Sequence, residues 1–113
     1  MQSASMPVVN NDLIGQRLDI FESYNLDEGG TELRWSQGEV VLVSDGFNIV
    51  KQNSRSACYK KGEAVMIRWD ANEDRNEEIT TSSQRLIPSK WNPRGKHMEG
   101  GGWRLDIGNV IQK

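Results

Sequence analysis

The sequence has little of what membrane-spanning, secreted or helical proteins need. No run approaches the roughly 18 apolar residues of a membrane span, and no long window repeats apolar residues as an amphipathic helix does. The start of the chain has neither the basic nor the apolar region of a signal peptide. The single cysteine, Cys58, excludes an internal disulfide. It fits a reducing environment, so we expect an intracellular protein, with the nucleus as one candidate compartment.

Residue sets for catalysis and metal binding are scarce as well. His97 is the only histidine, so the sequence offers no triad, and Cys58 with His97 makes no zinc site. Acids and amides alternate over 70–76 as in a calcium loop. However, Arg75 stands where such a loop requires glycine, and Thr81 where it requires a bidentate glutamate. We therefore expect a protein that is not an enzyme and uses neither metal nor cofactor.

Short strand-like runs separated by turn residues fill most of the chain instead. The length of 113 residues favours one domain, and the alternating pattern predicts an all-β fold. Because Pro88 cannot continue a strand ladder, a single helical turn is expected at 88–91. The predicted strands are 15–23, 32–44, 65–69, 79–87 and 103–107.

The predicted domain spans residues 13–108, with a disordered tail at 1–12, a long polar loop at 45–61 and a short tail at 109–113. Gly38 in the middle of the longest strand predicts a bulge or sharp bend. The tetrapeptide Arg-Leu-Asp-Ile occurs at 17–20 and again at 104–107. We interpret the two copies as first and last strands that pair and so remove a sheet edge.

This order of elements resembles a Tudor-like domain of the SH3-like barrel group, over residues 15–107. The second strand carries Trp35 and Gly38 before its valines, the third strand ends in Trp69 and Asp70, and a helical turn follows at 86–91. The resemblance implies a small, strongly bent, five-stranded antiparallel barrel. It also implies a monomeric, non-catalytic module that binds a peptide in a chromatin setting.

By this resemblance, Trp35 and Trp69 fall where the walls of an aromatic cage stand, and Phe21 could supply a third ring. The polar partner of a bound cation would be Asp70, Asn72 or Glu73. Electron-rich ring faces with a nearby carboxylate bind methylated lysine or arginine. The ligand expected is therefore a basic or methylated protein tail, and no membrane. The competing interpretation is that Trp35 and Trp69 fill the core.

Two further functions stay open. Residues 85–104 hold five basic residues against the single acid Glu99, and among them Lys90, Arg94 and Lys96 could line a face that contacts nucleic acid. The stretch 71–73 lacks the extra aromatic of methyl-reading domains, which favours a purely structural interaction domain. Trp91 and Trp103 are assigned to packing.

Overall fold

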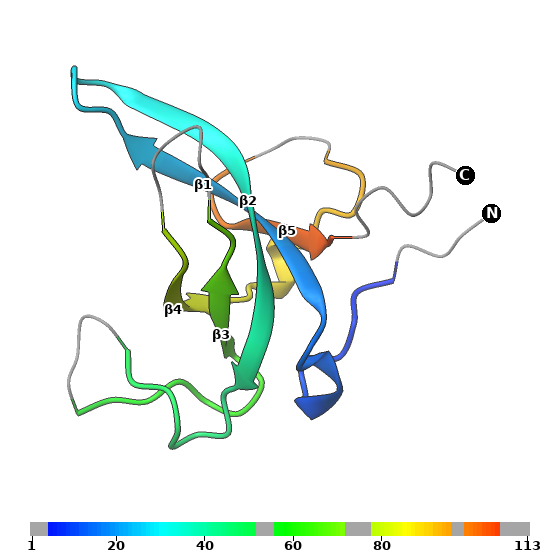
Figure 1. The fold of residues 1–113 in the computed structure, drawn as a ribbon. Coiled ribbons are helices and arrows are strands. Elements are labelled where there is room, and N and C mark those ends of the chain that lie inside the picture. Colours follow the sequence, from blue (N-terminus) through cyan, green and yellow to red (C-terminus); the bar gives the residue numbers. More distant parts are fainter. Residues whose placement is uncertain (1–4, 52–55, 72–77, 96–98, 107–113) are drawn as a thin grey trace.

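The computed structural model describes residues 5–51, 56–71, 78–95 and 99–106, and this part of the chain forms one antiparallel sheet with almost no helix (Figure 1). The strands lie in the order β4-β3-β2-β1-β5. No helix in these ranges is long and apolar enough to cross a membrane. The strands are β1 (Arg17–Asn25), β2 (Thr31–Val43), β3 (Ala64–Trp69), β4 (Thr80–Arg85) and β5 (Gly102–Leu105).

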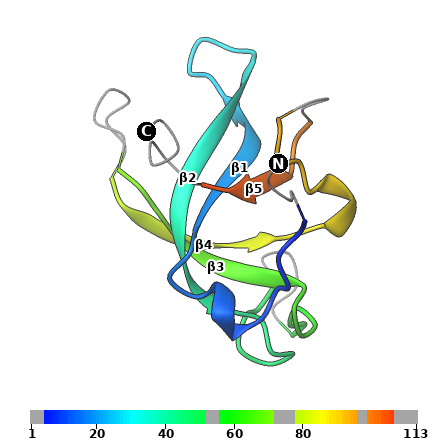
Figure 2. The same ribbon diagram turned by 90° about the vertical axis from the view of Figure 1, so that its right-hand side faces the viewer.

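The sequence-based prediction of an all-β domain with five strands is confirmed. The first and last strands pair, with Ile20 of β1 opposite Trp103 of β5. A 3-10 turn, η3 (Pro88–Lys90), follows β4 as the proline predicts. Figure 2 shows β3 and β4 crossing the direction of β1 and β2, so the sheet is strongly bent. Within the described residues β4 and β5 share no ladder, and the sheet is not closed into a barrel.

One side of the sheet carries the apolar core. Because side chains alternate along a strand, Leu18 and Ile20 of β1 lie on this side. The largest core side chain is Trp103, which is fully buried and whose indole Nε1 donates a hydrogen bond to the Ile87 carbonyl at 2.9 Å. This bond satisfies the one polar atom that burial would otherwise leave unpaired. We call this side of the sheet the core face and the opposite side the outer face.

Gly38 serves close packing of strands. The irregularity in the β2–β3 ladder lies between Val40 and Leu42, so the bulge expected at Gly38 itself is wrong. A Cβ atom at Gly38 would lie 2.4 Å from Cγ2 of Ile67 and 2.7 Å from the carbonyl oxygen of Arg68. Only glycine allows β3 to approach β2 this closely.

Two segments outside the sheet also contact the domain. Before β1, the turn η1 (Asn11–Leu13) buries Leu13, and Val9 packs against the core. In the long connection between β2 and β3, Ile49 is almost fully buried, and Val50 pairs with Cys58 in an isolated bridge. The start of this connection is therefore anchored to the domain.

Candidate functional site

The strand register divides the predicted cage aromatics between the two faces of the sheet. Phe21 of β1 lies directly opposite Trp35 of β2, so both side chains point to the outer face. Gly38 is three residues beyond Trp35 and therefore faces the other way, and it pairs with Trp69 of β3. Trp69 lies on the core face. The structure thus brings Phe21 and Trp35 together and does not bring Trp69 to them.

An arginine of the chain already occupies the aromatic pair on the outer face. The rings of Phe21 and Trp35 are 5.2 Å apart and tilted by 57°. The guanidinium carbon of Arg104 lies 3.9 Å from the centre of the Trp35 ring. Its Nε atom donates to the nearly buried carboxylate of Asp19 at 2.8 Å. The chain therefore supplies its own cation, ring and carboxylate here, and one ring face of Trp35 is covered.

Trp69 is half-buried at the end of β3. It packs against the core, and its Nε1 atom donates a hydrogen bond to Oγ of Ser82 at 2.7 Å. Its indole is thereby fixed in one orientation, while part of its surface stays exposed. This ring packs against the core, as the competing interpretation expects, and part of it still meets solvent.

Another aromatic on the core face, Tyr24, was not predicted from the sequence. Tyr24 lies six residues beyond Leu18 on β1 and therefore points to the same face. Its hydroxyl is hydrogen-bonded to Ser36, and the guanidinium carbon of Arg34 lies 4.0 Å from its ring centre. The alternation that starts at Leu18 and Ile20 could have indicated this position.

The predicted counter-charges are only partly described by the structure. Asp70 forms an ion pair with Arg17, and the two side chains are also hydrogen-bonded. This hydrogen bond is the main cause of the raised pKa of the Arg17 guanidinium. Arg17 also contacts Asp106 at 3.3 Å. Asp70 is therefore engaged within the domain. Asn72 and Glu73 lie outside the described residues.

One end of the sheet is strongly acidic. Trp69 pairs with Gly38, whereas β2 begins earlier at Thr31, so the β1–β2 hairpin extends past the end of β3 (Figure 1). Residues 22–34 of this hairpin hold four acids and one arginine, and residues 70–78 between β3 and β4 hold five acids and one arginine. Six of these nine acids belong to the described residues, and they are Glu22, Asp27, Glu28, Glu32, Asp70 and Glu78. We call residues 22–34 together with 69–71 and 78–80 the acidic end.

Glu22 is a half-buried carboxylate of this end. Burial raises the pKa of its carboxyl group above the ordinary value, while a hydrogen bond with Gln84 and attraction to Lys90 act in the opposite direction. These partners come from β4 and η3, so Glu22 faces the inside of the bent sheet. A partly desolvated carboxylate interacts more strongly with an incoming cation than a fully hydrated one.

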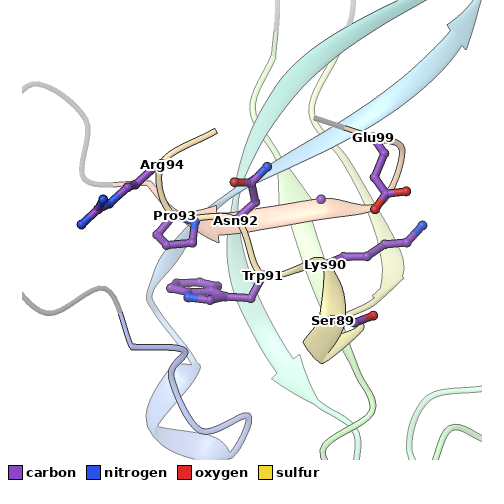
Figure 3. Close-up of a pocket in the computed structure, with 8 residues that line it drawn as sticks. Ser89, Lys90, Trp91, Asn92, Pro93, Arg94 and Glu99 are labelled. Atoms are coloured by element: carbon purple, nitrogen blue, oxygen red, sulfur yellow. The ribbon is translucent and has the colours of Figure 1, made fainter. Parts of the chain in front are cut away.

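A hollow of about 370 Å³ lies beside η3, on the segment that leads into β5 (Figure 3). Lys90 and Arg94 of the predicted nucleic-acid face both line it, whereas Lys96 lies outside the described residues. We call it the η3 hollow, and its lining residues are Ser89, Lys90, Trp91, Asn92, Pro93, Arg94, Glu99 and Gly102.

No metal-binding arrangement is found in the described ranges, where no three His, Cys, Asp or Glu side chains gather in a suitable group. The described residues offer aromatic surfaces, carboxylates at one end of the sheet and cations around the η3 hollow. Comparison with protein-family models, with curated proteins and with solved structures finds no match to this chain.

Proposed function

We propose that this chain is a non-catalytic binding module with a Tudor-like fold of the SH3-like barrel group, and that it binds a basic protein tail at the acidic end. The single observation that carries the proposal is that the partly exposed Trp69 ends β3 next to Asp70, at the same end of the sheet as the acidic hairpin 22–34. A cation gains both from the negative potential and from an aromatic ring face.

The finer fold assignment rests on the strand order and on contacts of the segment after β4. This segment contains η3, as the resemblance implies, and it runs beside β5. The backbone of Trp91 pairs with that of Trp103 in a parallel bridge, and the Asn92 amide donates to the Trp103 carbonyl at 2.8 Å. These bonds bring the end of the β4 segment to the other edge strand and support a barrel.

The geometry changes which rings we assign to the ligand. Trp35 carries Arg104 on one face and is tilted against Phe21, so these two rings stabilise the domain. Trp69 is the ring that meets the acidic end. Tyr24 lies on the same face, but Arg34 already covers one face of its ring. Each cation–ring contact contributes roughly 0.5–2 kcal/mol. With so few rings we expect weak binding, with a Kd on the order of 0.1–1 mM.

The proposal is tested by titrating a short lysine- and arginine-rich peptide, unmodified and with trimethylated lysine. The double variant Glu28→Gln with Glu78→Gln removes two exposed acids of the acidic end and should weaken binding. The matched control, Asp12→Asn with Glu39→Gln, removes the same charge elsewhere and should bind like the wild type. Equal weakening by both pairs would mean that only net charge matters, and the acidic end would lose its role.

A third variant tests the ring. Trp69→Leu keeps an apolar side chain on the core but removes the π-surface, so it should abolish any preference for the methylated peptide while the domain stays folded. Wild-type protein that binds neither peptide would leave the chain as a purely structural interaction domain.

A further inference from the structure

We propose that the η3 hollow binds a single-stranded nucleic acid, with one base against Trp91 and the backbone phosphates on either side of that base near Lys90 and Arg94. This site is separate from the acidic end and does not depend on the peptide proposal. Its volume of about 370 Å³ lies within the range of pockets that hold small ligands.

The indole of Trp91 is held in place before any ligand arrives. It meets Trp103 edge-on, with ring centres 4.8 Å apart and an interplanar angle of 66°. Trp103 is itself fully buried and hydrogen-bonded to Ile87. A ring that is already oriented loses little entropy when a base stacks on it. Such stacking contributes about 1–3 kcal/mol per base.

Two cations flank this ring. Figure 3 shows Trp91 and Asn92 between the side chains of Lys90 and Arg94. The Lys90 Nζ atom donates to the Gly100 carbonyl at 2.7 Å, which fixes the ammonium group and leaves two further protons for an acceptor. Arg94 is exposed, and no hydrogen bond or ion pair to a described residue engages its guanidinium.

The acids near the hollow are few. Glu99 is the only acidic side chain among the described residues that line the hollow. Glu22 lies close enough to Lys90 for the lysine charge to offset part of the burial-induced rise in the pKa of Glu22. Cations on opposite sides of a flat aromatic ring suit the two backbone phosphates that flank a stacked base. A single strand fits better than a duplex, because only unpaired bases can leave their stack and meet a side chain. A phosphopeptide would use the cations but not the ring.

The first experiment measures the salt dependence of binding. Labelled oligo-dT is titrated by fluorescence anisotropy at several salt concentrations with the wild type, Arg94→Gln and the control Arg68→Gln. Arg68 is an exposed arginine of β3 outside the hollow. One lost phosphate contact lowers the slope of log Kobs against log salt by about 0.7 for a single strand. We expect this change for Arg94→Gln and none for Arg68→Gln. Equal slopes for the two variants, or no binding by the wild type at low salt, would overturn the proposal.

The second experiment separates the base from the phosphate. An abasic strand of equal length should bind more weakly than oligo-dT, and oligo-dT should shift the indole NMR signal of Trp91 but not that of Trp69. Trp91→Leu should remove the difference between the two strands. Equal binding of the two strands by the wild type, or tighter binding of a phosphopeptide than of oligo-dT, refutes the nucleotide assignment. Peptide binding at the acidic end should be unchanged by Arg94→Gln, so failure of one proposal is distinguishable from failure of the other.

Discussion

Replacing Arg104 with methionine should destabilise the domain severely, because the substitution leaves the carboxylate of Asp19 without its partner. The Asp19 side chain is 9% exposed, and the two groups are 2.8 Å apart. Removing one member of a buried ion pair costs about 3–5 kcal/mol. The Arg104 side chain is 28% exposed. We therefore expect the low end of the range, about 3 kcal/mol, including the lost contact with Trp35.

Urea denaturation measures this loss. With an m-value of about 1.5 kcal/mol/M, the unfolding midpoint should fall by about 2 M. The control Arg68→Met removes an exposed pair, since Arg68 contacts Glu39 at 3.4 Å with 57% of its side chain exposed. That change should cost about 0–1 kcal/mol. Adding Asp19→Asn to Arg104→Met should restore part of the stability, because a neutral amide costs less to bury than a charge. Equal midpoints for the two single variants would refute the reasoning.

Two further predictions concern stability. Gly38→Ala should lower the free energy of unfolding by about 1–3 kcal/mol or more, because its new methyl group would lie 2.4 Å from Cγ2 of Ile67. The control Gly100→Ala should be nearly neutral in the same urea assay, because no atom lies within 4 Å of its added Cβ. Burial raises the pKa of Glu22, so the folded protein binds the carboxyl proton of Glu22 more tightly than the unfolded chain does. The folded state therefore loses stability as pH rises from the ordinary glutamate value of 4.5 through the folded pKa. Glu22→Gln should therefore be more stable than the wild type at about pH 7, and the gain should fade below about pH 4. If the stability difference between Glu22→Gln and the wild type were the same at both pH values, the raised pKa of Glu22 would be contradicted.

Much of the fold could be predicted from local sequence. Alternating apolar residues mark β1 at Leu18 and Ile20, and Pro88 marks the start of η3, whereas β4 ends earlier, at Arg85. The repeated tetrapeptide pointed to pairing between the first and last strands, and β1 does pair with β5. These features depend on periods of two residues and on the missing amide of proline, which a single sequence displays.

The grouping of aromatic residues could not be predicted in the same way. Whether Trp35 and Trp69 share a face depends on the register between β2 and β3, which places Trp69 opposite Gly38. A shift of one residue would reverse the face. The contact of Arg104 with Trp35 joins β5 to β2 across β1, and no local pattern reports such a contact. The role of Gly38 likewise depends on the neighbouring strand.

The most direct test of the account is an NMR titration of the labelled domain with the lysine- and arginine-rich peptide. Binding at the acidic end should shift the indole signal of Trp69 and the amide signals of the hairpin turn around Glu28. The indole signals of Trp103, which is fully buried, and of Trp91, in the η3 hollow, should stay in place. Shifts confined to Lys90–Arg94, or no shift at all, would contradict the proposed function.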